Sequence, residues 1–270
     1  KKIRGKRMET GLKGKKALIT GGGTGIGRAI ALTLAKERVA ISIASRNPHP
    51  ETIEDIKAQG VKAVWIPADV SKERDVIKMV KDTIGDLEGL DLYINNAAAH
   101  WDESVTKLTA KGWINSINTN LSACVWACRE ISKQFIKQGS GSIIIIGSTA
   151  VYSALPKETS YRVSKAGLKP YMELLAVELA PFGVRANMIT PGLFITNISK
   201  HVTEKSDLIM KTIPLRRAGN LDKDIGPAAV FLLSDRLSGY TTGSELIIDG
   251  GIHVFPNPMY TDDEIRSLNL

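Results

Sequence analysis

Cysteine, histidine and long apolar runs are all scarce in this chain. Two cysteines among 270 residues exclude a disulfide framework beyond a single pair and fit a reducing compartment, so we expect the cytoplasm. Cys124 and Cys128 lie four apart on an expected helix, without a histidine or acid placed beside them, and favour packing over metal binding. The histidines lack metal-binding spacing, so no catalytic metal is predicted; they are His49, His100, His201 and His253.

No stretch approaches the roughly 18–20 consecutive apolar residues of a membrane span. The longest run, Ile143–Ile146, has the length of a buried strand. The N-terminal segment also lacks the apolar core of a secretory signal. We therefore expect neither a membrane segment nor a secreted protein.

Positive charge is concentrated at one end of the chain. Of the net charge of +8, residues 1–16 supply +7, and the remaining residues are nearly neutral. Residues 1–13 are interpreted as a basic arm in solvent, in preference to a nucleic-acid or membrane contact.

Short β-branched runs alternate with amphipathic segments along the chain. This order predicts a doubly wound α/β fold with a parallel seven-stranded sheet over residues 14–251. The expected strands are 15–20, 39–44, 62–66, 91–94, 142–147, 185–190 and 245–248. The expected helices are 25–37, 49–59, 71–85, 107–138, 159–180 and 222–234. Residues 193–218 are too long for a simple connection and are interpreted as a substrate loop, and 252–270 as a C-terminal extension.

A glycine-rich turn joins the first expected strand to the first expected helix. Gly21, Thr24, Gly25, Ile26 and Gly27 lie where backbone can approach a pyrophosphate and where the helix N-terminus offers free N–H groups. Glycines alone would be equally consistent with a tight turn. The strand before and the helix after this turn favour a dinucleotide site.

The end of the second strand indicates which dinucleotide binds. No acid occurs between Glu37 and Glu51 to accept from a ribose 2′-hydroxyl, and the segment reads Ser45-Arg46-Asn47. Arg46 can face a 2′-phosphate and Ser45 can donate to it, so we predict NADP(H). The alternative is that Arg46 is a solvated loop residue. After the third strand, Asp69, next to Val70, suits the adenine amino group or a helix cap.

Tyr161 and Lys165 lie four residues apart on one face of an expected helix. Tyr161 follows Ser148 by 13 residues. A nearby ammonium and an oxidised nicotinamide would lower the pKa of the phenol and let it exchange a proton with a carbonyl or alcohol. By itself this spacing also occurs on helices with an exposed aromatic beside a solvated lysine.

Together, these motifs resemble the short-chain dehydrogenase/reductase family over roughly residues 14–251. The resemblance implies a Rossmann-type domain, catalysis by Ser148, Tyr161 and Lys165, and support of a proton relay by Asn120. It also implies a homotetramer or homodimer. The implied cofactor contacts are Gly21, Thr24, Gly25, Ile26, Gly27, Ser45, Arg46, Asn47, Asp69, Val70, Asn96, Ala97, Tyr161, Lys165, Pro191, Gly192, Ile195 and Thr196. The subgroup that looks most similar is the bacterial 3-oxoacyl-carrier-protein reductases and related carbonyl reductases.

Two positions depart from the family pattern. Ala98 stands where the family usually has glycine, which would strain the backbone if φ were positive there. Pro170 falls inside the expected helix 159–180, removes a donor and crowds the carbonyl of Ala166, so a kink or irregularity is expected.

The substrate side is expected at His100, Trp101, Val151–Glu158 and the loop 193–218. Trp101, Tyr152, Leu155 and Phe194 are interpreted as a partly apolar pocket or as ordinary packing. The extension is expected to cover an active site. These features favour an NADPH-dependent carbonyl reductase acting on a small molecule. The alternatives are a sugar or steroid alcohol dehydrogenase, or a nucleotide sensor or nucleic-acid binder without catalysis.

Overall fold

A single parallel sheet forms the centre of the computed structural model, which describes residues 8–196 and 210–255. Its strand order is β3-β2-β1-β4-β5-β6-β7. From β1, the strands β2 and β3 are added on one side of the sheet, and β4 to β7 are added on the other side. The strands are β1 (Lys16–Thr20), β2 (Ala40–Ser45), β3 (Ala63–Pro67), β4 (Leu92–Asn95), β5 (Gly141–Ile146), β6 (Val184–Pro191) and β7 (Glu245–Ile248). The predicted doubly wound, seven-stranded fold is confirmed, and each strand lies within one residue of its expected bounds.

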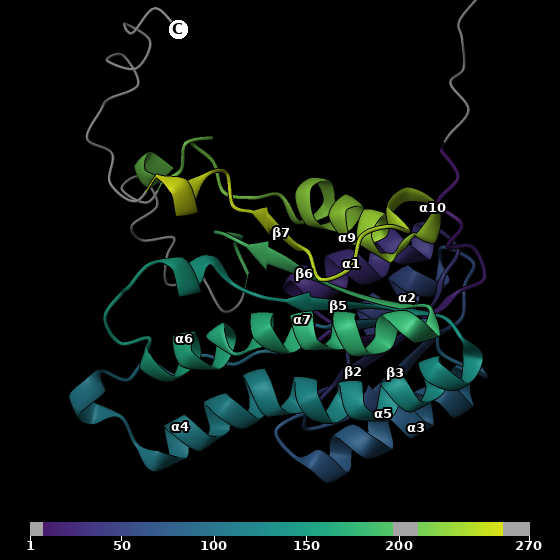
Figure 1. Ribbon diagram of the computed structural model, residues 1–270, viewed down its shortest axis with the longest axis horizontal. Coiled ribbons are helices and arrows are strands. Elements are labelled where there is room, and N and C mark those ends of the chain that lie inside the picture. The colour runs from purple at the N-terminus through teal and green to yellow at the C-terminus, as the bar shows by residue number, and fades with distance from the viewer. Residues whose placement is uncertain (1–7, 197–209, 256–270) are drawn as a thin grey trace, which may run out of the picture.

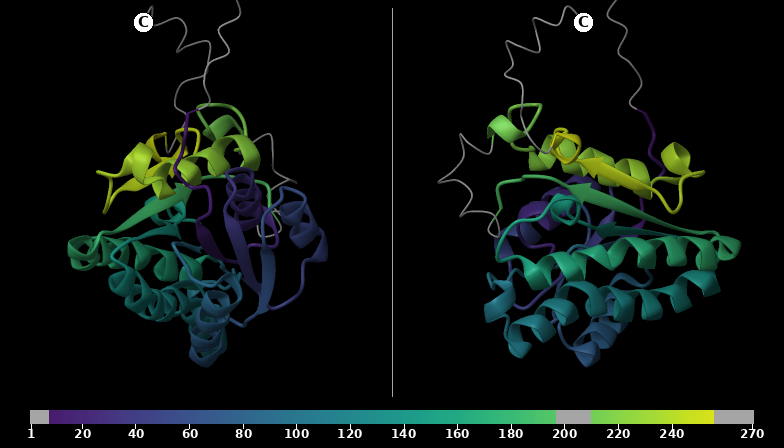
Figure 2. Two further views of the ribbon diagram at one scale, coloured as in Figure 1. Left: turned by 90° about the vertical axis from the view of Figure 1, so that its right-hand side faces the viewer. Right: turned by 60° about the vertical axis from the view of Figure 1, so that its left-hand side comes forward.

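Helices cover both faces of the sheet (Figures 1 and 2). One layer contains α1 (Gly25–Lys36), α2 (Pro50–Lys57), α9 (Gly226–Leu233) and α10 (Asp235–Ser238). The other contains α3 (Glu73–Leu87), α5 (Ala123–Gln138) and α7 (Leu168–Leu179), with α4 (Ala110–Ile117) and α6 (Thr159–Ala166) leading into it. Each helical layer packs against one face of the sheet and forms an apolar core with it. Strands covered on both faces have no solvent-exposed face, and every residue of β6 is accordingly buried.

The expected helix 107–138 is wrong at its start and at its centre. Residues Val105–Lys107 form a separate 3-10 turn, and α4 begins only at Ala110. Thr109 fixes that start, because its hydroxyl accepts from the Gly112 amide at 3.0 Å and satisfies one of the free N–H groups of the first turn. A π-helical turn at Asn118–Ser122 then separates α4 from α5.

The expected helix 159–180 is interrupted at Gly167, between α6 and α7. The interruption lies three residues before Pro170, which cannot donate to the carbonyl of Ala166. The irregularity expected from Pro170 is therefore confirmed. The expected helix 222–234 likewise opens with a π-helical turn at Leu221–Ile225.

Cys124 and Cys128 are buried free thiols on α5, as the packing interpretation predicted. Within the described ranges, no helix is long and apolar enough to cross a membrane. Parts of three predicted segments lie outside the described residues: positions 1–7 of the arm, 197–209 of the substrate loop, which include His201, and 256–270 of the extension.

Candidate active site

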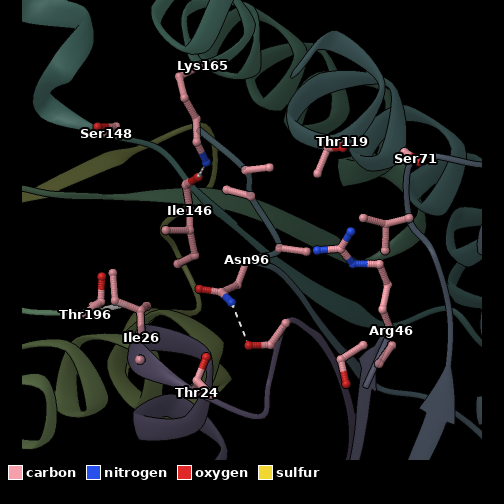
Figure 3. Close-up of a pocket in the computed structure, with 18 of the residues that line it drawn as sticks. Thr24, Ile26, Arg46, Ser71, Asn96, Thr119, Ile146, Ser148, Lys165 and Thr196 are labelled. Atoms are coloured by element: carbon pink, nitrogen blue, oxygen red, sulfur yellow. Dashed lines mark hydrogen bonds between the residues drawn. The ribbon is translucent and has the colours of Figure 1, made fainter. Parts of the chain in front are cut away.

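A cleft of about 570 Å³ opens at the carboxyl edge of the sheet, where the segments that follow six of the strands converge. Figure 3 shows side chains from these segments facing one another across it. Most of the residues predicted from the sequence line this cleft: Gly21, Thr24, Gly25, Ile26, Ser45, Arg46, Asn47, Asp69, Val70, Asn96, Ala97, Ser148, Tyr161, Lys165, Pro191, Gly192 and Thr196. Three do not, namely Gly27, Asn120 and Ile195.

The glycine-rich turn is shaped by backbone that other residues would not tolerate. Gly21 and Gly25 have φ values of 64° and 52°, in the left-handed region. Gly27 lies beneath the turn, where a Cβ atom would stand 2.4 Å from the Gly21 carbonyl oxygen. Asn96 braces the turn from β4, because its side-chain amide donates to the carbonyls of Thr20 and Gly21 at 2.9 and 3.2 Å. The turn is thus fixed close to the sheet, with its outer side open to the cleft.

The N-terminus of α1 faces the cleft with its backbone donors unsatisfied by side chains. Thr24 is the N-cap residue, yet its side chain makes no capping hydrogen bond, and the first turn contains no acid. Free N–H groups and the positive end of the helix dipole favour a phosphate at this position. The residues present therefore fit the pyrophosphate of a dinucleotide.

Arg46 leaves the end of β2 and extends into the cleft (Figure 3). Its guanidinium is exposed and makes no hydrogen bond or ion pair with the described residues. Ser45 differs from expectation, because its hydroxyl donates to the Asn47 carbonyl at 2.8 Å and accepts from the Trp65 indole at 3.0 Å. The single hydroxyl proton is occupied within the loop, so the predicted donation from Ser45 to a phosphate is not available in this arrangement.

Asp69 organises the turn between β3 and α3. Its carboxylate accepts from the Ser71 amide at 3.2 Å and from the Ser71 hydroxyl at 2.8 Å, and the Lys72 ammonium lies 3.4 Å away. Burial raises the pKa of Asp69, but these partners outweigh it and leave the pKa below its usual value. The N-cap residue of α3 is Lys72, so Asp69 orders the preceding turn instead of capping the helix directly.

Ser148, Tyr161 and Lys165 meet at the same end of the cleft, although Ser148 belongs to the segment after β5 and the other two belong to α6. Lys165 is only 4% exposed, and its ammonium donates to the Ile146 carbonyl at 2.9 Å. Burial lowers the pKa of Lys165 to about 8. Figure 3 shows this side chain reaching from α6 to the end of β5.

The groups of the protein itself do not lower the pKa of Tyr161; the predicted lowering, which also invokes an oxidised nicotinamide, stays a prediction. Burial raises the pKa of Tyr161, and the hydrogen bond with Ser148 offsets this only partly. Burial dominates because a phenolate loses most of its hydration in this position. The described groups together therefore favour the neutral phenol of Tyr161.

Asn120 lies behind the cleft, fully buried in the π-helical turn. Its amide donates to the Ala99 carbonyl at 2.9 Å and to the Ser164 hydroxyl at 2.9 Å, and its oxygen accepts from the Ala99 amide at 2.8 Å. Ser164 in turn donates to the Tyr161 carbonyl at 2.7 Å. Asn120 thus fastens the segment after β4 to the helix that carries Tyr161. π-Helical turns are frequent at such positions.

At the end of β6, Pro191, Gly192 and Thr196 reach the cleft, whereas Ile195 is exposed toward an adjoining cavity of about 460 Å³. Gly192 packs closely against the segment after β7, because a Cβ atom there would stand 2.5 Å from the Cβ of Asp249. Ala98 needs no glycine, since its φ is not among the positive values of the described residues. The backbone therefore tolerates alanine at this position.

Several cleft residues were not predicted from the sequence: Ala44, His49, Ala68, Ser71, Ala99, Asn115, Thr119, Ile146 and Gly147. His49 lies across the glycine turn, where a Cβ on Gly23 would be 1.9 Å from its ring. The position of Thr119 directly before Asn120 could have indicated that it lies near the site. Nothing in the local sequence indicates His49 or Asn115. Among the expected apolar residues, Trp101 and Phe194 line the cleft, whereas Tyr152 and Leu155 are exposed outside it. In residues 8–196 and 210–255, no cluster of histidine, cysteine and acids could hold a metal.

The fold and the cleft together define a Rossmann-type α/β domain with a candidate dinucleotide site. A family model described as enoyl-(acyl carrier protein) reductase matches residues 21–253. This match shows that the chain belongs to the short-chain dehydrogenase/reductase family, whose members use nicotinamide cofactors.

Individual relatives agree with this assignment. A 3-oxoacyl-acyl-carrier-protein reductase (FabG) of Staphylococcus epidermidis is 33% identical over 244 residues, which is 89% of this chain and 99% of that protein. The crystal structure of a putative short-chain alcohol dehydrogenase from Sinorhizobium meliloti superposes with a TM-score of 0.86 at 29% identity, covering 90% and 98% of the two chains. A putative 2-deoxy-D-gluconate 3-dehydrogenase from Agrobacterium tumefaciens, with bound NADP, gives 0.83 at 30% identity and covers 90% and 98%.

Proposed function

We propose that this protein is an NADP(H)-dependent carbonyl reductase that transfers a hydride between nicotinamide and a ketone or secondary alcohol, with 3-oxoacyl-type compounds as substrates. The observation that carries the proposal is that Ser148, Tyr161 and Lys165 line the same cleft as the glycine turn. A proton-transfer group and a dinucleotide cradle within one cleft are what carbonyl reduction requires.

Arg46 supports NADP(H) over NAD(H). It projects into the cleft without a partner among the described residues, and no carboxylate follows β2 to accept from a ribose 2′-hydroxyl. An unpaired guanidinium is suited to a phosphate, which it can bind through two hydrogen bonds. Asn47 lies beside it in the same lining. The proposed cofactor contacts are the residues predicted from the sequence, with two changes. The Ser45 hydroxyl is hydrogen-bonded within its own loop and does not donate to the phosphate, and Ile195 contacts the cofactor only through its backbone.

The chain's own groups are arranged for proton transfer. When bound, the nicotinamide supplies the hydride in reduction and accepts it in oxidation. Tyr161, kept neutral by burial, holds the proton that a carbonyl oxygen needs as it becomes an alcohol. Ser148 orients that oxygen. Lys165 also lines the cleft, and its ammonium is held there by donation to the Ile146 carbonyl. Asn120 positions Tyr161 through Ser164.

Similarity to the Staphylococcus epidermidis reductase and the apolar wall formed by Trp101 and Phe194 support a 3-oxoacyl substrate. Oxidation of a sugar-type hydroxyl is the second candidate, because the Agrobacterium tumefaciens structure with a comparable superposition is named a putative 2-deoxy-D-gluconate 3-dehydrogenase. The same catalytic residues would serve both reactions.

Two further properties belong to the proposal. The enzyme acts in the cytoplasm as a homotetramer or homodimer. Buried free thiols on α5 support a reducing compartment. Exposed apolar side chains at Leu174, Val177 and Phe182, on or just after α7, support association between copies.

The test measures NADPH oxidation with 3-oxoacyl thioesters, simple ketones and keto-sugars. We expect the thioesters to give the highest kcat/KM and Tyr161→Phe to abolish turnover while retaining NADPH binding. Arg46→Ala should raise the KM for NADPH about 10- to 100-fold, the loss expected for a charge-assisted hydrogen bond, and leave the KM for NADH unchanged. Full turnover by Tyr161→Phe would refute the catalytic assignment. An equal effect of Arg46→Ala on both nucleotides would refute the assigned NADP preference.

A further inference from the structure

Two opposite charges flank Tyr161 on its own helix. Glu158 is the N-cap residue of α6, and Arg162 lies one turn further along. Their side chains pair at 2.6 Å between Arg162 Nη2 and Glu158 Oε2, and the Arg162 amide donates to the Glu158 carbonyl at 3.0 Å. Only 14% of the Arg162 side chain and 21% of the Glu158 side chain are exposed. The pair therefore lies in a partly desolvated environment, where charges act over longer distances than in water.

A histidine closes the other side of this pair. The imidazole of His100 meets the Tyr161 ring edge-on, with ring centroids 5.2 Å apart, and its Nε2 lies 3.9 Å from Glu158 Oε1. A backbone bridge between Glu103 and Glu158 joins the segment after β4 to the start of α6. Tyr161 is consequently enclosed by groups from both segments.

Hydrogen bonds do not satisfy all the charged atoms of Glu158 and Arg162. Arg162 Nη1 donates to the Ala150 carbonyl, two residues after Ser148. However, Glu158 Oε2 and Arg162 Nη2 are buried and, despite their proximity, lack hydrogen-bonding geometry with each other or with other described groups. Each charge is balanced mainly by the other. Removing one charge leaves the other without its main partner.

We propose that Glu158 and Arg162 are positioning residues that act as a balanced charge pair next to the His100–Tyr161 contact, so that neutralising either one changes the pH dependence of proton transfer by Tyr161. This inference rests on the proposed function, in which Tyr161 exchanges the reacting proton. Burial is the main influence on the pKa of Tyr161 and raises it, and the Ser148 hydrogen bond lowers it. Beyond these, the Glu158 carboxylate raises the pKa and the Arg162 guanidinium lowers it.

Among the described titratable residues, His100 contacts the Tyr161 ring from the segment after β4, and Lys165, on α6, lines the same cleft as Tyr161. The Ser148 hydroxyl faces it from the segment after β5. All three remain unchanged in the variants that test the proposal. Differences between those variants therefore report on Glu158 and Arg162.

The experiment records kcat/KM for alcohol oxidation against pH, because oxidation requires Tyr161 to accept a proton. Arg162→Gln leaves the Glu158 charge alone, so we expect the midpoint of the profile to move to higher pH. Glu158→Gln leaves the Arg162 charge alone and should move it to lower pH. The double variant Glu158→Gln/Arg162→Gln should return the midpoint close to that of the unmodified enzyme.

Arg162→Lys is the matched control, since it keeps the positive charge and should leave the midpoint in place. A purely structural role would impair all neutralised variants together without opposite shifts. If Arg162→Gln does not fold, Glu158→Gln alone must move the midpoint to lower pH while Arg162→Lys does not. Equal or absent shifts in the single variants would overturn this inference, whereas activity of Tyr161→Phe would overturn the proposed function itself.

Discussion

Lys165 illustrates how a position proposed for catalysis lowers the stability of the fold that carries it. Its ammonium is buried beneath the cleft, and burial lowers its pKa from 10.5 to about 8. Replacing Lys165 by methionine keeps an unbranched chain of similar length and removes the charge. We expect Lys165→Met to lose turnover and yet unfold at a higher denaturant concentration at pH 7.

The magnitude follows from the pKa difference between the folded and unfolded protein. At about 1.4 kcal/mol per pH unit, the lowering corresponds to a destabilisation on the order of 3 kcal/mol at pH 7. Methionine also leaves the Ile146 carbonyl without its donor, which costs about 1 kcal/mol of the gain. A net gain of roughly 2 kcal/mol is therefore expected for Lys165→Met.

The dependence on pH provides the sharper test. Between pH 8 and 10.5 the unfolded chain binds the Lys165 proton more tightly than the folded protein does, so the lysine-containing protein gains stability as pH rises through this window. The advantage of Lys165→Met should shrink over the same window. Urea unfolding at fixed protein concentration, without added nucleotide, measures it at pH 7, 8, 9 and 10. Lys81→Met, an exposed position on α3, controls for the loss of a charge. A stability difference between Lys165→Met and the unmodified protein that does not change with pH would refute the reasoning.

Two further substitutions test how the cleft is supported. Gly27→Ala should impair both folding and NADPH binding, because its Cβ would stand 2.4 Å from the Gly21 carbonyl oxygen, whereas Gly85→Ala on α3 meets no atom within 4 Å and should stabilise by up to about 1 kcal/mol. Thermal unfolding and nucleotide titration of the two variants make the comparison, and equal behaviour would contradict it. Asn120→Ala should lower the free energy of unfolding by about 1–3 kcal/mol, since it leaves the half-buried backbone polar groups of Ala99 without these partners. Its kcat should fall more than its KM for NADPH rises. Steady-state kinetics check this, and an unchanged kcat would exclude a positioning role.

The fold was largely readable from the sequence because its signals are local. Apolar runs of strand length and intervening helical periodicity identified all seven strands to within one residue. The errors lie in the long helices. The start of α4 depends on a cap at Thr109, and the π-helical turn around Asn120 accommodates hydrogen bonds to residues distant in the sequence. Periodicity alone carries no information about either.

The site divides in the same way. The glycine turn was recognisable from spacing, because the positive φ values of Gly21 and Gly25 and the close packing of Gly27 each require glycine locally. The hydrogen bonds that occupy the Ser45 hydroxyl depend partly on Trp65, twenty residues away. Whether that hydroxyl is free for a ligand could not be inferred from its position after β2.

By itself, the sequence determined the order of strands and helices, the glycine turn, the lack of an acid after β2 and the spacing of Tyr161 and Lys165. These features depend on neighbouring residues and on the periodicity of side chains along a helix or strand. Only the tertiary structure decided that burial raises the pKa of Tyr161 and that Glu158 and Arg162 balance each other beside it. Desolvation and charge pairing depend on which distant segments exclude water from a group, and that is fixed only when the sheet and its helices assemble.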